Sequence, residues 1–396
     1  MNPIDDILIL SGSRTAIGSF GGSLSGLSPA DLGTVAAKAA IGNAGVDATA
    51  INHAVFGHII TTAPQDAYLA RHIALNAGLA QSSAAMNVNR LCGSAVQSVI
   101  SAAQMLLMGD GQLALAGGAE SMSRGAYLLP GIRTGLRMGA APLTDLTLGI
   151  LTDPFGSGHM GLTAERIAAQ YQISRQQLDE FALQSQQRAT KAIQAGYFSS
   201  QITPVTVTSG KSSFVFAQDE HPRADTSLSS LAALKPAFSK EGIVTAGNSS
   251  GLNDGAAALL LSTRQFADSH GLKARARLRG YSFAGVAPEL MGLGPIPAVQ
   301  QLLQKTGLSV ADLDVIESNE AFAAQAIAVS RTLGFDAAKT NPNGGAIALG
   351  HPVGATGSIL IVKAMHELER INGQFALVTM CIGGGQGIAL LLERLN

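Results

Sequence analysis

Two cysteines and one histidine are the residues whose chemistry and surroundings first suggest a function. Cys92 lies in NRLCGSA, Cys381 in MCIGGGQG and His351 in ALGHPVGATGS. The chain has no other cysteine, which excludes a disulfide framework. A thiol that a neutral imidazole can deprotonate is a nucleophile suited to covalent catalysis. These residues therefore predict thiol chemistry, provided that the fold brings them together.

Cys92 follows a polar turn and precedes a helix that we expect to begin near Gly93 and Ser94. Unpaired N–H groups and the helix dipole stabilise a thiolate at such a position, so we expect the pKa of Cys92 to be lowered. The alternative is an inert thiol, because most free cysteines pack as small apolar side chains. The local sequence leaves both readings open.

His351 also stands directly ahead of a predicted helix, between glycines and a proline. The chemical interpretation is a base that activates a thiol. The alternative is a turn histidine that only hydrogen-bonds to the backbone. Asn319 and Glu320, in SNEAFAAQ, lie where a predicted strand gives way to a helix, which is where α/β proteins collect ligands. Taken alone, that pair is more simply explained as a helix N-cap.

Cys381 stands before a segment in which four of six residues are glycine. Glycine allows backbone N–H groups to face a developing oxyanion, although the same pattern is typical of a packing turn beside an inert thiol. A dinucleotide-binding loop is excluded by spacing, because glycines at 383 and 385 require a third glycine where Ile388 stands.

The composition indicates a large protein with an extensive apolar interior. The 396 residues suggest two or three domains, and 46% of them are hydrophobic while only 13% are charged. The net charge of −1, without a long run of like charge, argues against a nucleic-acid partner. No apolar run reaches the roughly 18 residues of a membrane span, and MNPIDDILIL lacks a signal-peptide pattern. We therefore expect a soluble, cytoplasmic protein that does not contact a membrane.

Helices and strands are expected to alternate, as in an α/β protein. One helix should start with Ser28 as N-cap and Pro29 at its first position, and a second should run from Ser174 to a stop at Gly196. The expected strands cover residues 6–10, 54–60 and 113–117.

The chain also repeats one pattern of elements. Residues 93–118 and 354–380 both run from a glycine turn through an apolar helix to Gly-Gln and a short strand. GQLAL at 111–115 corresponds to GQFAL at 373–377, which predicts a duplicated α/β unit. The more irregular and charged stretch from 119 to about 250 is interpreted as an insertion that builds a binding wall and subunit contacts.

Eight motifs, in one order along nearly the whole chain, together resemble the thiolase family of acetyl-CoA acyltransferases and β-ketothiolases. Small departures, such as HPVGATG and NSSG, are conservative. The motifs are GSRTAIGSFGGSLS, LCGSA, GGAESMS, HMGLTAE, TAGNSSGLNDGAAA, NEAFAAQ, NPNGGAIALGHPVGATG and CIGGGQG.

The resemblance implies the thiolase fold, which is α/β, with two duplicated halves in a five-layer α-β-α-β-α arrangement and an inserted loop domain. The N-terminal half then covers 1–118 plus 251–271, the loop domain 119–250, and the C-terminal half 272–396. It also implies dimers that pair into a homotetramer, with residues near 121–140 making the tetramer contact. Coenzyme A is implied as substrate and product, with no permanently bound cofactor and no metal.

The resemblance further implies a role for each motif residue. Cys92 attacks a thioester while His351 takes its proton, and Cys381 then acts as acid and base on the α-carbon of acetyl-CoA. His351 and a water held by Asn319 form one oxyanion hole, and the backbone N–H groups of Cys92 and Gly383 form the other. The implied reaction is reversible condensation and thiolysis of acetoacetyl-CoA and other short-chain 3-ketoacyl-CoAs.

Further positions match the family's substrate-binding pattern. Arg223 is expected to meet a phosphate, although an ordinary solvated arginine is the alternative. Met160, Met291 and Phe322 resemble the narrow pockets of short-chain members, but methionine is pliable, so medium or long acyl chains are an alternative. The implied substrate and CoA contacts are Leu151, His159, Met160, Arg223, Ser230, Leu234, Ala237, Phe238, Ser250, Met291 and Phe322.

Three other readings remain. A condensing enzyme of the ketoacyl synthase type shares the implied fold, but the second cysteine and the NEAF asparagine argue against it. A non-catalytic, thiolase-like carrier of CoA or lipid is disfavoured because all four reactive residues are present. A redox switch, in which Cys92 and Cys381 form a disulfide, is compatible with catalysis and remains a hypothesis.

Overall fold

Two halves with the same strand order make up the core of the protein. The computed structural model describes residues 3–210 and 212–395. In the N-terminal half β3 is parallel to β5, which pairs antiparallel with β12, which in turn pairs antiparallel with β1. In the C-terminal half β14, β15, β16 and β13 repeat this pattern. The strands of the first half are β1 (Ile7–Arg14), β3 (His53–Gly57), β4 (Ala84–Val88), β5 (Leu113–Ser121) and β12 (Asn253–Thr263), and those of the second are β13 (Ala276–Gly285), β14 (Val315–Ser318), β15 (Phe375–Ile382) and β16 (Gln386–Arg394).

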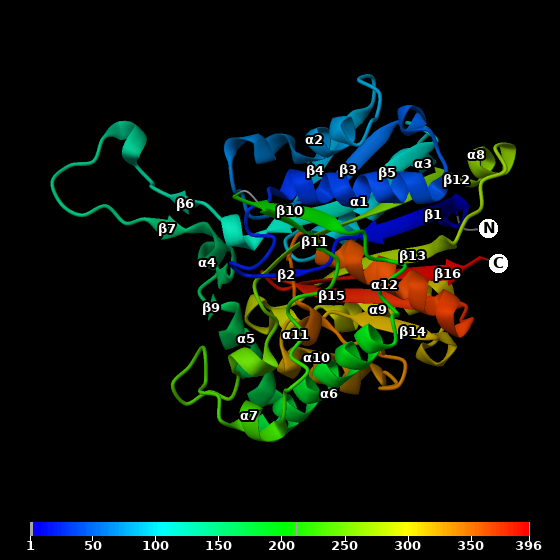
Figure 1. Cartoon of the computed structure of the whole chain (residues 1–396). Coiled ribbons are helices and arrows are strands. Elements are labelled where there is room, and N and C mark those ends of the chain that lie inside the picture. Colours follow the sequence, from blue (N-terminus) through cyan, green and yellow to red (C-terminus); the bar gives the residue numbers. More distant parts are fainter. Residues whose placement is uncertain (1–2, 211, 396) are drawn as a thin grey trace.

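Helices separate and cover the two halves of the sheet (Figure 1). Two helices pack between the halves, two cover the outer face of the first half, and two cover the outer face of the second. β1 and β13 pair at two residues only, which joins the halves along one edge. This arrangement confirms the predicted duplication and the five-layer fold. The central helices are α3 (Ser94–Leu107) and α12 (Thr356–Ile371), and the outer ones are α1 (Pro29–Ala44), α2 (Leu69–Asn76), α9 (Pro295–Thr306) and α10 (Ala323–Leu333).

The strands are apolar on both faces because each strand lies between two helical layers. In β12, Ala257, Leu259 and Leu261 join the central core around α3 and α12. Their neighbours Ala256 and Leu260 join the outer core under α1 and α2. This alternation follows from the two-residue period of a strand.

Local signals fix the helix ends well. Ser28 caps α1 by accepting the Asp31 N–H, and Gly45 ends the helix at a φ of 66°, which glycine adopts without strain. Ser174 caps α6 (Arg175–Gln194), and Gly196 follows its end, as predicted.

The three predicted strands have other limits in the structure, and the one expected over 6–10 is β1, Ile7–Arg14. The strand expected over 54–60 ends at Gly57, because the backbone N–H groups of Ile59 and Ile60 turn to the buried Glu120 carboxylate. The strand expected over 113–117 continues to Ser121, since it pairs with β12 along its whole length.

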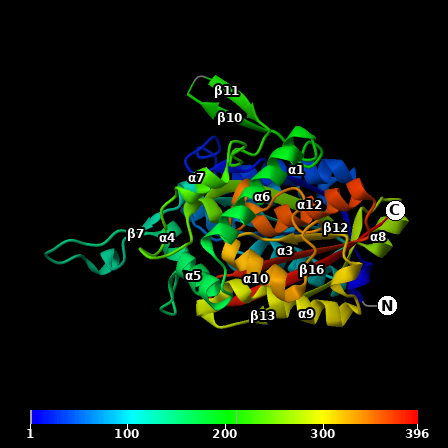
Figure 2. The same cartoon turned by 90° about the horizontal axis from the view of Figure 1, so that it is seen from below.

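The segment between β5 and β12 forms helices against the C-terminal half and two projecting hairpins (Figure 2). A fully buried ion pair ties it to β1: the Arg14 guanidinium bonds both Asp219 oxygens, at 2.7 and 2.9 Å. Its elements are α4 (Leu146–Ile150), α5 (Met160–Gln170), α6, α7 (Leu228–Ala232) and the hairpins β6 (Tyr127–Leu128) with β7 (Thr144–Asp145) and β10 (Val205–Ser209) with β11 (Ser212–Phe216). The remaining short elements are β2 (Gly18–Ser19), β8 (Thr152–Asp153), β9 (Gly158–His159), α8 (Arg264–Ser269) and α11 (Ala346–Leu349).

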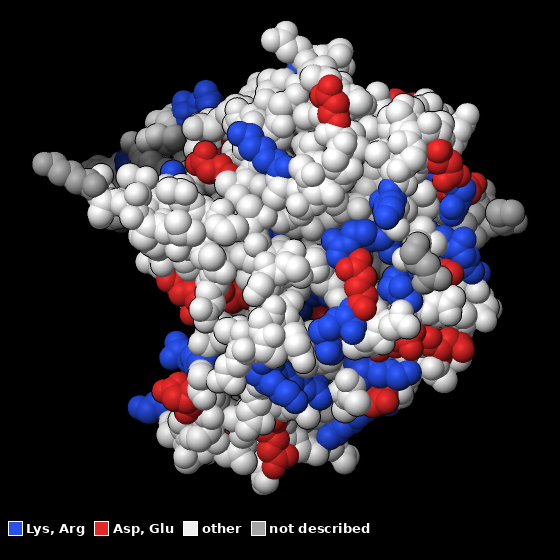
Figure 3. Space-filling view, turned by 45° about the vertical axis from the view of Figure 1, so that its right-hand side comes forward, with Lys and Arg blue, Asp and Glu red and all other residues white. Residues whose placement is uncertain are grey.

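The surface carries charges of both signs. On the face drawn in Figure 3, lysine and arginine side chains lie among aspartate and glutamate side chains. None of the helices in the described part of the chain has the length and apolarity needed to cross a membrane.

Candidate active site

A cavity of about 910 Å³ lies where the two halves and the inserted segment meet. Four of the five predicted catalytic residues and all the predicted substrate contacts line it. Asn319 is the exception and lies behind the wall. The predicted residues on the wall are Cys92, His351, Cys381, Gly383, Leu151, His159, Met160, Arg223, Ser230, Leu234, Ala237, Phe238, Ser250, Met291 and Phe322.

Cys92 sits on a tight turn between β4 and α3. Leu91 before it has a φ of 47°, a left-handed conformation that costs a leucine about 1–2 kcal/mol. The Ser94 hydroxyl donates to the Leu91 carbonyl at 2.6 Å and so holds this turn. A Cβ on Gly93 would lie 2.5 Å from the Ile382 side chain, which requires glycine there. The turn thereby presents the Cys92 thiol to the cavity.

The pKa of Cys92 is raised, so the expectation of a lowered pKa is wrong. Burial of the thiol raises its pKa, and the negative charge of Glu120 adds to the effect. The backbone N–H groups of Gly383 and of Cys92 itself favour the thiolate, but burial outweighs them. Cys92 is thus a thiol at neutral pH and needs a base before it can attack.

His351 is 5% exposed and has the hydrogen bonds of a neutral base. The Thr356 hydroxyl donates to the Pro352 carbonyl at 2.9 Å, so it accepts the Nδ1–H of His351 at 2.7 Å. The Nε2 lone pair is then free to accept, and Asn319 Nδ2 lies 3.4 Å from it. Burial lowers the pKa of His351 to about 4, which keeps the ring neutral at physiological pH.

Asn319 does not line the cavity itself, and its side chain contacts the site at the His351 ring. Its backbone N–H donates to the Thr379 carbonyl at 3.0 Å, which fixes it between the ends of β14 and β15. The side chain is 1% exposed, and its Oδ1 has no hydrogen-bond partner within the described chain. The simpler reading, a helix N-cap, is wrong, because α10 begins four residues later at Ala323, with Phe322 in the cap position.

Cys381 lies in β15 and is 1% exposed. Burial raises the pKa of its thiol strongly, and the charge of a Cys92 thiolate raises it further, so the two sulfurs interact across the cavity. The β15–β16 connection turns through Gly384 and Gly385, whose φ angles are 79° and 83°. A Cβ on Gly385 would stand 2.3 Å from the Val286 carbonyl. The turn itself therefore requires these glycines, and they do not indicate a nucleotide-binding loop.

Aromatic rings form the wall opposite the cysteine turn. The His159 ring stacks on Phe238 with centroids 4.7 Å apart, and Phe238 meets Phe322 edge-on at 5.9 Å. A Cβ on Gly161 would lie 2.2 Å from the Phe238 ring, so glycine lets α5 approach it. This wall offers a thin and mostly uncharged ligand a rigid, apolar surface.

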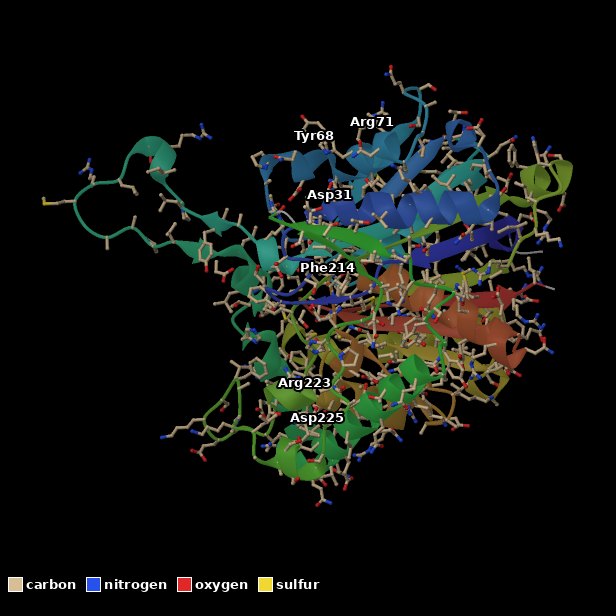
Figure 4. All side chains as sticks on the ribbon, viewed as in Figure 1. Asp31, Tyr68, Arg71, Phe214, Arg223 and Asp225 are labelled. Carbon is tan, nitrogen blue, oxygen red and sulfur yellow. The ribbon has the colours of Figure 1, made fainter. Side chains whose placement is uncertain are left out.

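Arg223 and Asp225 lie close together on the segment that precedes α7 (Figure 4). Both side chains are exposed and line the outer part of the cavity. The Arg223 backbone N–H donates to the Gln186 side chain at 2.9 Å, which fixes this segment to α6. An anionic group at the cavity mouth could pair with the Arg223 guanidinium.

The sequence analysis named only Leu151 from a second apolar wall, which lies beside Cys92. This wall belongs to one small core of residues from the loop after β3, the Cys92 turn, the inserted segment and the His351 turn. Ile59 and Val353 immediately follow His58 and Pro352, but nothing in their local sequence marked them as cavity residues. His221, beside Gly251, was also missed. The lining residues of this wall are Ile59, Leu91, Met122, Ile150, Leu151, Leu252 and Val353.

Two buried histidines should make the fold sensitive to acid. Burial lowers the pKa values of His351 and His366 from 6.5 to about 4, and Arg275 contributes at His366. Between pH 6.5 and 4 the unfolded chain binds more protons, so stability present above pH 6.5 is lost as the pH falls. We expect a loss of roughly 2–3 kcal/mol for each ring. Urea unfolding at pH 7 and pH 4.5 measures the loss, and His366→Gln should remove about half of it.

A doubled α/β fold with two thiols and a neutral imidazole in one cavity is suited to an acyltransferase that carries the acyl group on a cysteine. Residues 7–265 match the family described as Thiolase, N-terminal domain, and residues 272–394 match Thiolase, C-terminal domain. The chain belongs to the thiolase family. Within the described residues, no cluster of three or more His, Cys, Asp or Glu side chains could hold a metal ion.

Relatives resemble the chain over its full length. It is 54% identical over 391 residues to the beta-ketothiolase BktB of Cupriavidus necator, covering 98% of this chain and 99% of the relative. An acetyl-CoA acetyltransferase of Escherichia coli is 47% identical, with 98% and 99% covered. The human mitochondrial 3-ketoacyl-CoA thiolase solved in complex with CoA is 40% identical, with a TM-score of 0.96 and 99% and 98% covered.

Proposed function

We propose that this protein catalyses reversible transfer of an acyl group between an acyl-CoA and acetyl-CoA, acting on acetoacetyl-CoA and other short-chain 3-ketoacyl-CoAs. The observation that carries the proposal is the meeting of Cys92, Cys381 and His351 in one cavity. Beta-ketothiolases and acetyl-CoA acetyltransferases 46–54% identical to the chain support the same reaction.

In the first step His351 Nε2 takes the Cys92 proton and the sulfur attacks the thioester carbonyl. The carbon–sulfur bond to CoA breaks, and CoA leaves as a thiol with the proton that His351 took from Cys92. An acyl-cysteine remains, so one difficult transfer becomes two easier steps. The raised pKa of Cys92 makes this base necessary, and the unprotonated Nε2 of His351, which the Asn319 amide contacts, supplies it.

In the second step His351 takes the Cys381 proton, and the Cys381 thiolate removes a proton from the α-carbon of acetyl-CoA. An α-proton beside a thioester is far less acidic than an ordinary thiol, so a thiolate of raised pKa is the better base. The resulting carbanion attacks the acyl carbon on Cys92, the carbon–sulfur bond to Cys92 breaks, and the Cys92 sulfur takes the proton held by His351. In thiolysis Cys381 returns the proton to the departing acetyl-CoA carbanion.

Two oxyanion holes are proposed to stabilise these steps. The Gly383 and Cys92 N–H groups face the Cys92 sulfur and are placed for the acyl oxygen. While His351 holds the Cys381 proton, its Nε2–H is placed to donate to the second thioester oxygen, together with a water that donates to the unpartnered Oδ1 of Asn319. The His159–Phe238 wall suits pantetheine, and Arg223 suits a CoA phosphate.

The domain roles and the assembly are part of the proposal. We assign residues 1–118 plus 251–271 and 272–396 to the two catalytic halves, and residues 119–250 to a loop domain that binds CoA. We also propose a cytoplasmic homotetramer. The projecting β6–β7 hairpin supports the tetramer, because it carries the exposed apolar side chains of Tyr127, Ile132 and Met138.

A chain-length series tests the substrate range. With CoA as co-substrate, kcat/KM should be highest for acetoacetyl-CoA and other short 3-ketoacyl-CoAs, because Met160, Met291 and Phe322 narrow the cavity near Cys381. Steady-state kinetics with substrates of increasing acyl length provides the measurement. A rise in kcat/KM towards medium or long chains would favour a degradative long-chain thiolase. Turnover of malonyl thioesters instead would indicate a ketoacyl synthase, and no turnover at all a CoA or lipid carrier.

A further inference from the structure

A buried ion pair that the mechanism does not use lies beside the catalytic turns. His58 Nδ1 is 2.9 Å from Glu120 Oε1, and His58 Nε2 is 3.6 Å from Asp66 Oδ2. Glu120 is fully buried and His58 is 8% exposed. Buried charges are costly unless they are paired, so this pair calls for a function.

The Glu120 carboxylate connects the two halves of the fold. Its Oε2 accepts the Gly354 N–H from the C-terminal half at 2.9 Å. Its two oxygens also accept the N–H groups of Ile59 and Ile60 from the N-terminal half, each at 3.2 Å. Gly354 lies three residues after His351, so the carboxylate holds the turn that carries the proposed base.

The packing around this carboxylate leaves little room for movement. A Cβ on Gly118 would lie 2.1 Å from the Gly354 carbonyl, and one on Gly57 would lie 2.8 Å from the Ala95 backbone nitrogen. Ala95 lies in the first turn of α3, directly behind Cys92. Small changes at Glu120 should therefore reach both the Cys92 turn and the His351 turn.

The charges around Cys92 make His58 important. Glu120 on β5 disfavours the Cys92 thiolate, while His351 is neutral and Cys381 is a thiol at neutral pH. Two other carboxylates are already engaged elsewhere. Asp66, in the loop after β3, faces His58 Nε2 at 3.6 Å. Asp254, on β12, accepts the Ser123 N–H at 2.9 Å. Burial lowers the pKa of His58, but the charge of Glu120, the contacts with Asp66 and Glu120 and the hydrogen bond to the Ala119 carbonyl raise it to about 10. His58 is thus an imidazolium and offsets the charge of Glu120.

We propose that His58 and Glu120 are positioning residues of this enzyme: Glu120 holds the His351 turn against the Cys92 turn, and the His58 imidazolium offsets part of the negative charge that Glu120 imposes on the Cys92 thiolate. The inference rests on the proposed role of Cys92 as nucleophile. Neither His58 nor Glu120 lines the cavity, so both residues would act through the turns that carry Cys92 and His351.

The test is the pH dependence of Cys92 alkylation in the full-length protein. Iodoacetamide labelling of the Cys92 peptide, followed by mass spectrometry, reports the thiolate without requiring turnover. His58→Gln leaves Glu120 uncompensated, so the labelling curve should move to higher pH, with about tenfold slower labelling at pH 8. The double variant His58→Gln with Glu120→Gln removes both charges and should move the curve back.

His366→Gln is the matched control, since His366 is a half-buried histidine on α12 that contacts Ser200 and Arg275 and does not line the cavity. Its labelling curve should coincide with that of the parent protein. A purely structural role for His58 would lower stability without moving the curve, and an unmoved curve in His58→Gln overturns the proposal. Acyl transfer without Cys92 would contradict the proposed function. If the labelling curve of His58→Gln still moved in that case, the proposed effect of His58 on the Cys92 thiolate would remain supported.

A second measurement needs no substitution and decides the matter if His58→Gln does not fold. Nitrogen-15 NMR of the histidine-labelled parent protein distinguishes imidazolium rings from neutral ones. At pH 8.5 one of the eight histidines should remain an imidazolium. Eight neutral rings at that pH would overturn the proposal.

Discussion

Cys92→Ser should abolish the acyl-enzyme. A serine hydroxyl is a far weaker nucleophile than a thiolate, and His351, with a pKa of about 4, is too weak a base to activate it. We expect kcat for thiolysis of acetoacetyl-CoA to fall by about 10⁴-fold or more. Mass spectrometry of the intact protein, mixed with acetyl-CoA and quenched with acid, should show an added acetyl group in the parent protein and none in the variant.

Two comparisons make this result specific. The variant should keep its affinity for CoA, measured by calorimetry, because the aromatic wall formed by His159 and Phe238 is untouched. Ser200→Ala, a hydroxyl loss beside His366 and away from the cavity, should keep normal acylation. An acetylated Cys92→Ser protein, or a label on another residue of the parent, would remove Cys92 from the mechanism.

The sequence predicted the architecture because its strongest patterns are local and repeated. The Gly-Gln-strand repeats led to two halves, and the halves have the same strand order. Ser28 and Ser174 marked helix starts because an N-cap serine satisfies backbone N–H groups within three residues. The motif residues gathered in one cavity because equivalent strand and helix ends meet where the two halves join.

What the sequence could not give depends on contacts between distant segments. The raised pKa of Cys92 comes from burial and from Glu120, and neither is visible in NRLCGSA. The early end of β3 depends on the same carboxylate, 60 residues away from Ile60. His58 drew no attention because its partner Glu120 belongs to another motif. The expectation that a helix start lowers the pKa of a thiol considers the backbone N–H groups and leaves out the opposing effect of burial.

The two thiols are proposed to act in different steps, and their environments differ in a way that suits this division. Cys92 is partly exposed to the cavity and faces backbone N–H groups, which suits attack on a carbonyl. Cys381 is buried beside apolar side chains, which makes its thiolate a stronger base and a less accessible nucleophile. The fold thus gives the two thiols different environments, that of Cys92 suited to a nucleophile and that of Cys381 suited to an acid and base.

Cys381→Ser should separate the two half-reactions. Acylation of Cys92 needs only His351 and the oxyanion hole, so the variant should still form the acetyl-enzyme, at a reduced rate. Removal of an α-proton needs the Cys381 thiolate, and a serine at that position lacks both the acidity and the basicity at the required pH. We therefore expect loss of about 10³-fold or more in exchange of the acetyl methyl protons of acetyl-CoA with deuterium from solvent.

Proton NMR of acetyl-CoA in deuterium oxide measures the exchange, and acid-quench mass spectrometry measures the acetylation in the same samples. Cys92→Ser provides the reciprocal control, because it should lose acetylation whatever happens to exchange. If Cys381→Ser slowed both half-reactions equally, the sulfur would serve the architecture of the cavity and the division of labour between the two cysteines would be wrong. If it slowed neither, the base would have to be His351, whose unprotonated Nε2 also faces the cavity.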